Sequence, residues 1–384
     1  MKITEVKANK ILDSRGAETI EVAVNGCAAS APSGKSTGKY ETPSFHNSID
    51  WNVDFINAMN FDFPIEKFED LEKVEELIKK QLGFKDAKEF GANALFALES
   101  AILKALAVSK KKQLWQVVNA RAKKFPRPAG NAIGGGLHSA QFDEHPTFQE
   151  FLLIPADKTF EGRVNTMNEV YQKLASIFGA TEKNDEGAWQ VPMGESEIFE
   201  ILDRFRDRID VGIDAASTSF YKNGQYKYKI LMSRKQQIDY INLLVEKYKL
   251  IYVEDPVEEE DFEGFSMITR KTMVVGDDLT ATHLNRLQKA IDNKSISGMI
   301  IKPNQNGSLI EVARVFEMCK KNKIKTILSH RSGETMDDAL ADYAFAFGAD
   351  FIKCGISTPF RECKLNRMIE IEHSLPRKEE KKDA

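Results

Sequence analysis

Six short apolar runs in the second half of the sequence each end at a polar or charged residue. These residues are, in order, Asp214, Glu254, Asp277, Lys302, His330 and Lys353. From Glu254 onward the intervals are 23, 25, 28 and 23 residues, which is about the length of one strand, one helix and two short loops. Since the carboxyl ends of parallel barrel strands open onto one face, we expect these side chains to meet there.

Three of these residues are acids on successive strands, and their convergence requires a cation. The carboxylates of Asp214, Glu254 and Asp277 cannot all stay ionised side by side without one. Oxygen ligands without His or Cys beside them favour Mg²⁺ over zinc. Lys302 follows on the next strand, and a metal and the second lysine, Lys353, should lower its pKa toward a neutral, basic amine. The expected chemistry is metal-assisted proton abstraction next to a carboxylate.

The elements that carry these residues predict two domains and a tail. Residues 127–375 alternate apolar runs with helical stretches, which indicates an α/β fold with a (β/α)8 barrel. Residues 1–126 predict an α+β capping domain. Its period-two strand at 20–24 precedes the hairpin signal Asn25-Gly26, and helical periodicity covers 66–82 and 93–108. Residues 376–384 form a charged, solvated tail.

The composition restricts the partners that we expect. Lys and Arg total 54 against 58 Asp and Glu, a net charge of −4, so no field of the whole protein attracts nucleic acid or an anionic membrane. No apolar run approaches the ~18 residues of a membrane span. Four cysteines without a Cys-x-x-Cys pair favour a reducing, cytoplasmic location.

Several motifs together resemble one family, the enolases, which dehydrate 2-phosphoglycerate to phosphoenolpyruvate. The similarity runs over nearly the full chain. Its motifs are Ala31-Pro32-Ser33-Gly34-Lys35-Ser36-Thr37-Gly38, Phe148-Gln149-Glu150-Phe151, Asp185-Glu186-Gly187, Val253-Glu254-Asp255-Pro256, Gly276-Asp277-Asp278-Leu279 and Ser329-His330-Arg331-Ser332-Gly333-Glu334-Thr335. A Lys or His base with one or two Mg²⁺ is the established pattern of this superfamily, and we take it over from there.

The resemblance implies a role for individual residues. Asp214, Glu254 and Asp277 would hold one Mg²⁺, and Ser36 together with the substrate phosphate would hold a second. Lys302 would remove the C2 proton, and Glu186, supported by Glu150, would protonate the departing 3-hydroxyl. The remaining residues would bind the small phosphorylated carboxylate substrate: Arg331 and Ser332 its phosphate, Lys353 its carboxylate, with His138, Gln149 and His330 beside it.

The loops around these residues depart from the usual family pattern. Lys35 replaces a small Ala, Gly134 and Leu137 alter Asn-Gly-Gly-Ser-His, and Asn184 and Ala188 alter Gly-Asp-Glu-Gly-Gly. Pro303 follows the proposed base, and residues 42–63 lack the family's usual sequence. The family implies a homo-oligomer, a dimer or higher. Three hypotheses follow: an enolase of glycolysis and gluconeogenesis, a paralogue acting on another phosphorylated or phosphonylated hydroxy acid, and a non-catalytic interaction protein. The altered loops favour the second, and retention of every chemical group weighs against the third. We place the first ahead of the second.

Overall fold

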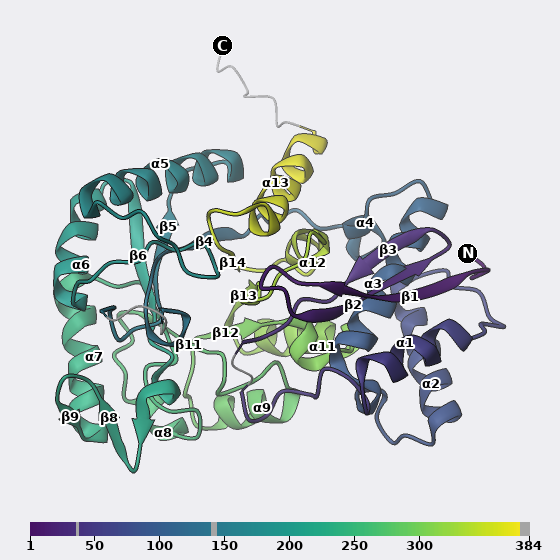
Figure 1. Cartoon of the computed structure of the whole chain (residues 1–384), viewed down its shortest axis with the longest axis horizontal. Coiled ribbons are helices and arrows are strands. Elements are labelled where there is room, and N and C mark those ends of the chain that lie inside the picture. Colours follow the sequence, from purple (N-terminus) through teal and green to yellow (C-terminus); the bar gives the residue numbers. More distant parts are fainter. Residues whose placement is uncertain (36–37, 140–143, 377–384) are drawn as a thin grey trace.

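The computed structural model describes residues 1–35, 38–139 and 144–376. Ser36 and the charged tail from residue 377 onward lie outside these ranges. The described residues form a three-stranded sheet with its helices near the N-terminus, a closed eight-stranded barrel, and a small three-stranded sheet of β7 (Tyr221–Lys222), β8 (Gln225–Lys227) and β9 (Leu231–Met232). Figure 1 shows the N-terminal elements side by side with the barrel.

The N-terminal sheet is an antiparallel meander in the order β1, β2, β3. Its strands are β1 (Val6–Leu12), β2 (Glu18–Val24) and β3 (Cys27–Ser30). The β2–β3 turn consists of Asn25 and Gly26, with φ of 48° and 81°. Positive φ at both turn residues matches the right-handed twist of the flanking strands, so the expected hairpin is present.

The helices of this region follow local capping signals. The predicted helix at 66–82 is η1 (Phe68–Asp70) followed by α2 (Leu71–Leu82), and it ends where Gly83 takes φ 71°. No element was expected over residues 42–63, but α1 (Ile49–Ala58) lies there. It is capped by Ser48 Oγ, which accepts from Trp51 N–H at 3.1 Å. The remaining elements are η2 (Ala87–Phe90), α3 (Ala92–Ser109) and α4 (Leu114–Asn119).

Helix α3 is the hydrophobic centre of the N-terminal region. It has the length and composition of a membrane span, although we expected no apolar run of that kind. Of its residues, 83% are buried inside the protein, where the helix packs against β2 and β3. Its apolar faces on all sides are therefore explained by tertiary packing.

The barrel closes in the order β10-β11-β12-β13-β14-β4-β5-β6. Its strands are β4 (Arg127–Gly134), β5 (Glu150–Pro155), β6 (Ile209–Asp214), β10 (Tyr252–Glu254), β11 (Met273–Gly276), β12 (Gly298–Ile301), β13 (Lys325–Ser329) and β14 (Phe351–Lys353). The strands pair in parallel except at β5, which is antiparallel to both neighbours. The barrel is confirmed, and β5 is its one reversed strand.

Side chains that alternate in direction along the barrel strands belong to two hydrophobic clusters, one inside the barrel and one between the strands and the helices. Ala129, Leu152, Ile154, Tyr252, Val275, Ile300, Ile327 and Phe351 form one cluster, and they come from seven of the eight strands. Their neighbours in sequence, such as Val253, Val274 and Leu328, belong to the larger core beneath the helices. This period of two explains why the strands read as continuous apolar runs.

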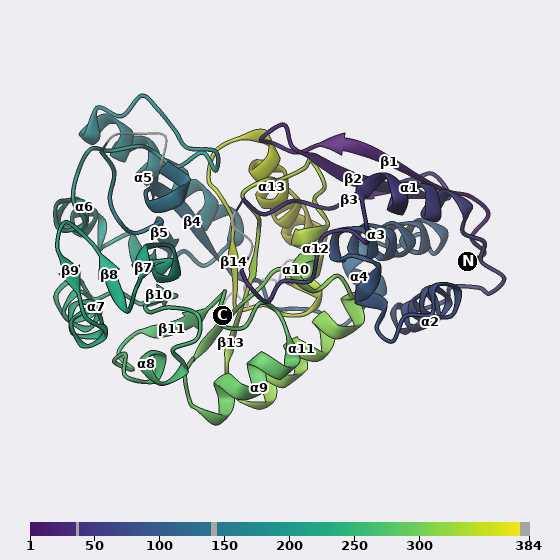
Figure 2. The ribbon, with the colours of Figure 1, turned by 60° about the horizontal axis from the view of Figure 1, so that its bottom comes forward.

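Helices surround the strands, as Figure 2 shows. They are η3 (Gly136–Ser139), α5 (Phe160–Phe178), α6 (Glu195–Leu202), η4 (Asp203–Phe205), η5 (Ser217–Phe220), α7 (Arg234–Tyr248), α8 (Phe262–Ser266), α9 (Leu284–Asp292), α10 (Pro303–Asn306), α11 (Leu309–Lys321), α12 (Ala339–Ala346) and α13 (Pro359–Ser374). The N-terminal region contacts this ring through α2 on α11, α3 on α10 and α4 on α12. It is therefore held beside the barrel by helix packing.

Candidate active site

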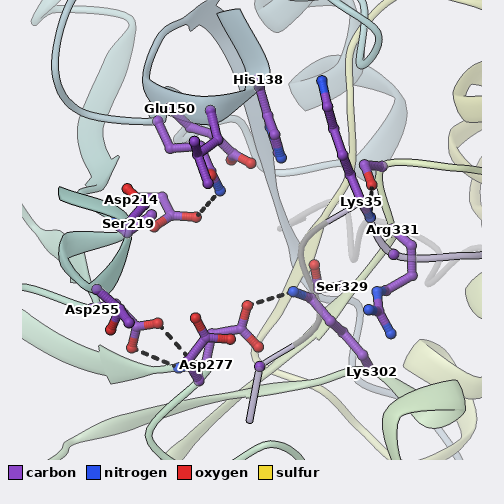
Figure 3. A pocket seen from close by; sticks show the side chains of 18 of the residues that line it. Lys35, His138, Glu150, Asp214, Ser219, Asp255, Asp277, Lys302, Ser329 and Arg331 are labelled. Carbon is purple, nitrogen blue, oxygen red and sulfur yellow. Dashed lines mark hydrogen bonds and ion pairs between the residues drawn. The ribbon is translucent and has the colours of Figure 1, made fainter. Parts of the chain in front are cut away.

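A cavity of about 230 Å³ lies at the carboxyl ends of the barrel strands. Its walls combine strand ends, the β4–β5 loop and a segment of the N-terminal region that includes Gly34, Lys35, Gly38 and Lys39. Figure 3 shows the charged side chains that converge on it. This is the barrel face on which active sites are built.

Lys353, the last residue of β14, is surrounded by carboxylates. Its Nζ lies 2.9 Å from Asp214 Oδ2, 2.9 Å from both oxygens of Glu254 and 3.1 Å from Glu150 Oε2. All four side chains are buried. Burial alone would lower the pKa of Lys353, but the surrounding carboxylates raise it well above its usual value. Lys353 is therefore a buried cation in contact with three acids at one end of the barrel.

Lys302, at the end of β12, is ion-paired with Asp277, which directly follows β11. Figure 3 shows the two side chains meeting across the cavity. Burial alone would lower the pKa of Lys302, but the Asp277 carboxylate raises it above its usual value. In this structure the nearest charge to Lys302 is an acid, so its pKa is raised, and the lowered pKa expected beside a metal stays a prediction.

Asp255 holds the turn that carries Asp277. Its two carboxylate oxygens accept the backbone N–H groups of Asp277 and Asp278, each at 3.0 Å. Burial raises the pKa of Asp255 well above its usual value and that of Asp278 to about 8. The three acids offer ligand atoms within 4.8 Å of one another. Asp255 and Asp278 were given no role from the sequence, although each directly follows an acid that was.

Glu150, Glu186 and His138 form a second cluster with ligand atoms within 4.8 Å of one another. His138 Nδ1 lies 3.4 Å from Glu186 Oε2, which also accepts from Asn131 Nδ2 at 3.2 Å. Burial raises the pKa of Glu150 well above its usual value. Burial would also raise that of Glu186, but the charge of His138 holds it well below. The two neighbouring carboxyl groups are thus pushed in opposite directions.

The third side of the cavity consists of residues that follow β13. Arg331 Nη2 donates to both oxygens of Glu41 from the N-terminal region, at 3.1 and 2.8 Å. Ser332 Oγ accepts from Lys35 N–H at 2.8 Å. Burial lowers the pKa of His330 well below its usual value, so its imidazole is neutral. This side offers a guanidinium, a hydroxyl and a neutral imidazole to a bound anion.

The structure brings together nearly all of the residues predicted from the sequence. Those that line the cavity are His138, Gln149, Glu150, Glu186, Asp214, Asp277, Lys302, His330, Arg331, Ser332 and Lys353. Gln149 Nε2 donates to Asp214 Oδ2 at 3.4 Å. Glu254 lies behind the cavity wall, where it accepts from Tyr252 Oη at 2.5 Å. The prediction for Ser36 falls outside the described residues.

The residues that hydrogen-bond to the site residues and orient them were not predicted from the sequence. Glu41 pairs with Arg331, Gln305 Nε2 donates to Asp277 Oδ1 at 3.1 Å, and Tyr252 donates to Glu254. Asn131 and Asp255 act in the same way on Glu186 and Asp277. Of these, only Asp255 fell inside a quoted motif, and Tyr252 looked like an ordinary core residue.

The strand-end acids fit a divalent cation by their chemistry. Asp214, Glu254 and Asp277 are buried carboxylates on neighbouring strands and offer oxygen atoms only, which hard cations prefer. Burial and the nearby Asp214 raise the pKa of Glu254 to about 8. The positive charge around the three acids is therefore too small to keep all of them ionised. In this structure the ammonium groups of Lys353 and Lys302 supply part of that charge.

The fold and the cavity together define a class of protein. A barrel whose strand ends carry acids and two lysines, beside a carboxyl pair with divergent pKa values, is suited to acid–base chemistry on a small anion. The chain matches two family models, "Enolase, N-terminal domain" over residues 3–118 and "Enolase, C-terminal TIM barrel domain" over residues 122–382.

Curated proteins named Enolase are similar over nearly their whole length. That of Natronomonas pharaonis is 37% identical, over 96% of this chain and 98% of the relative. Those of Archaeoglobus fulgidus and Picrophilus torridus are 35% and 34% identical, with coverage of 97–99% on both sides. The chain belongs to the enolase family and is an enzyme of the lyase class. The family acts on a small phosphorylated substrate with a divalent metal.

Proposed function

We propose that the protein catalyses the Mg²⁺-dependent dehydration of 2-phosphoglycerate to phosphoenolpyruvate, a step of glycolysis and gluconeogenesis. The observation that carries this proposal is one cavity in which Lys302, Lys353 and a carboxyl pair face Arg331. The reaction needs a base at C2, charge stabilisation at the carboxylate, an acid at C3 and a cationic phosphate site. Each of these has a candidate group in the cavity wall.

Asp214, Glu254 and Asp277 would hold one Mg²⁺, and Ser36 with the substrate phosphate a second. When bound, Mg²⁺ attracts the charge that develops on the substrate carboxylate. The buried carboxylates of the three acids make these positions favourable for a divalent cation and unfavourable for an empty, fully ionised cluster.

Lys302 is the proposed base. It accepts the C2 proton at Nζ, and the electron pair of the broken C–H bond moves into the carboxylate. Lys302 must be neutral to do this, and its partner Asp277 raises its pKa. Lys302 can act only when Asp277 is neutralised by another positive charge, which couples the base to occupation of the acid cluster.

Lys353 and the carboxyl pair complete the reaction. Lys353 is a buried cation whose attraction for the substrate carboxylate grows as negative charge develops there. Burial keeps a proton on Glu150, which neighbours Glu186. The pair therefore shares one proton. Glu186 acts as the acid once this proton has passed to it from Glu150, and it protonates the 3-hydroxyl as the C3–O bond breaks, so that water leaves and Glu186 is left ionised.

The remaining residues bind and enclose the substrate. Arg331 and Ser332 hold the phosphate, and a guanidinium is suited to two of its oxygens at once. His138, Gln149 and His330 line the rest of the cavity. The neutral imidazole of His330 can donate or accept a hydrogen bond without adding charge.

The test is to follow phosphoenolpyruvate formation from 2-phosphoglycerate by ultraviolet absorbance, with Mg²⁺ and with a chelator. We expect turnover that Mg²⁺ supports and the chelator abolishes. A folded protein that forms no phosphoenolpyruvate with Mg²⁺ would overturn the proposal. Replacing 2-phosphoglycerate with other phosphorylated or phosphonylated hydroxy acids separates the proposal from the paralogue alternative, which Lys35 and Leu137 in the cavity wall favour.

We propose a cytoplasmic location and a homo-oligomer. Cys27, Cys319, Cys354 and Cys363 are free thiols, which supports a reducing compartment. Light scattering coupled to size-exclusion chromatography tests the assembly, and a monomer at micromolar concentration would contradict it.

A further inference from the structure

Lys35 contacts two separate loops of the cavity wall. Its backbone N–H donates to Ser332 Oγ at 2.8 Å. Its side-chain Nζ donates to Asp185 Oδ2 at 3.1 Å. Figure 3 shows Lys35 extending along the cavity from the side of Arg331, opposite Asp214. Lys35 therefore links the loop after β13 to the loop that carries Glu186.

The backbone end of this link is held closely against the barrel. A Cβ atom on Gly34 would lie 2.1 Å from Arg331 Nη2, so the chain passes directly over the guanidinium. Ser33 N–H donates to Gly333 O at 2.7 Å, and Gly333 N–H donates back to Ser33 O at 2.9 Å. The backbone of Lys35 is therefore held against the barrel, and its side chain extends from there to Asp185.

The other end of the link is the loop of residues 184–188, which we call the acid loop. Asn184 Oδ1 accepts the N–H groups of Glu186 and Ala188 at 3.0 and 2.9 Å, which shapes the loop from inside. Asp185 points the other way. Its Oδ1 is buried without a hydrogen-bond partner among the described residues, and its Oδ2 is bonded to Lys35. The ion pair is thus the polar anchor of this side chain.

Lys35 differs from Lys302, Lys353 and Arg331 in its surroundings. Lys302, Lys353 and Arg331 pair with acids that are at most 11% exposed. The side chains of Lys35 and Asp185 are 39% and 19% exposed. Water and salt reach this pair, so its strength is modest and falls with ionic strength.

We propose that Lys35 is a positioning residue for the acid Glu186, because its ion pair with Asp185 ties the N-terminal segment to the acid loop. The inference rests on the proposed function in assigning proton delivery to Glu186. The ion pair therefore affects the rate of the second half of the reaction, the loss of the 3-hydroxyl. It does not affect the rate at which Lys302 removes the C2 proton.

The first experiment measures the acid loop without relying on activity. Trypsin cleaves after Lys183, an exposed residue immediately before the loop. Lys35→Ala and Asp185→Asn should each increase the cleavage rate after Lys183 by about two- to fivefold, the range for a partly exposed ion pair. The double variant should be no faster than either single variant, and Lys35→Arg should retain most of the protection.

Lys39→Ala is the matched control. Lys39 lies on the same segment and lines the same cavity, so this variant removes one positive charge without touching the acid loop. Cleavage after Lys183 should match the unmodified protein in Lys39→Ala. Equal cleavage in Lys35→Ala and the unmodified protein would overturn the inference, whatever the activity.

The second experiment separates the two halves of the reaction. In deuterated water, Lys35→Ala should lower the turnover rate about two- to fivefold while C2 exchange of 2-phosphoglycerate keeps its rate, so the ratio of exchange to turnover rises. Added salt should lower turnover in the unmodified protein more than in Lys35→Ala. Equal loss of exchange and turnover would assign Lys35 to substrate capture and contradict the inference. Inactivity of the unmodified protein would instead remove the proposed function.

Discussion

Glu150, the first residue of β5, is the register partner of Asp214, the last residue of β6. The first residue of one strand and the last residue of its neighbour meet at the same end of the barrel because β5 runs antiparallel. Glu150 thereby reaches Lys353 at 3.1 Å and joins the cluster with Glu186. Because β5 is reversed, its amino-terminal residue lies on the barrel face where the other strands end.

Lys302→Ala should abolish solvent exchange of the C2 proton, because no other described amine lies at the end of β12. We expect a loss of at least ~10²-fold, the lower range for removal of a general base. Exchange is measured by NMR in deuterated water. Calorimetry should still detect Mg²⁺ binding, because the strand-end acids are unchanged. Lys271→Ala, on an exposed pair with Glu246, is the control, and persistent exchange in Lys302→Ala would contradict the role.

Asp255→Asn should weaken Mg²⁺ binding by about 10–100-fold, as is typical when a group that orients a metal ligand is lost. The amide replaces an oxygen that accepts from Asp277 N–H or Asp278 N–H with a donor, so two donors face each other. Isothermal titration of Mg²⁺ measures the effect. Asp210→Asn, at the opposite end of β6, should leave the affinity unchanged, and equal affinities in the two variants would disprove the orienting role of Asp255.

Gly134 and Asn184 should depend on each other. A Cβ on Gly134 would lie 2.3 Å from Asn184 Nδ2, so Gly134→Asn alone overpacks the acid loop, at a cost of about 1–3 kcal/mol. Asn184→Gly alone loses the two N–H bonds that shape the loop. The double variant restores the usual family residues and should recover stability and turnover relative to Gly134→Asn. Thermal unfolding and steady-state rates check this, and additive losses would exclude the dependence.

Glu99→Gln should stabilise the protein at pH 8. Burial, aided by the charge of Glu75, raises the pKa of Glu99 well above its usual value. A raised carboxyl pKa gives stability below the unfolded pKa that is lost as pH rises through the folded pKa. Glutamine keeps an oxygen for Leu309 N–H, now 2.7 Å from Glu99 Oε2.

The expected gain for Glu99→Gln is a Tm about 2 °C higher at pH 8, shrinking as the pH falls toward 4. Scanning calorimetry across this range measures it. The exposed Glu76→Gln on α2 is the control. A gain that does not grow with pH would show that Glu99 is ionised in the folded protein.

The positions of the strand ends were accessible from the sequence because each strand is short, apolar and closed by a charged residue. Asp214, Glu254, Lys302 and Lys353 lie where the pattern predicted them, at or just after the last residue of a strand. Helix α1 was not predicted, since its apolar residues Ile49, Trp51, Val53 and Phe55 alternate with period two, and its helix signal is the cap Ser48. The pKa of Lys302 was predicted to be low beside a metal, whereas the pairing with Asp277 that raises it in this structure could not be inferred from the sequence.

The spacing of chemical groups along the chain, and the kind of barrel that brings them to one face, can be inferred from the amino-acid order. Local patterns suffice for this, because apolar runs and helical periods repeat at the length of a strand–helix unit. The reversal of β5 and the pairing of Lys302 with Asp277 and of Lys35 with Asp185 are set by the folded arrangement of the chain. These pairs lie 25 to 150 residues apart, and contacts at such separation follow from how the strands close and where the N-terminal segment crosses the barrel.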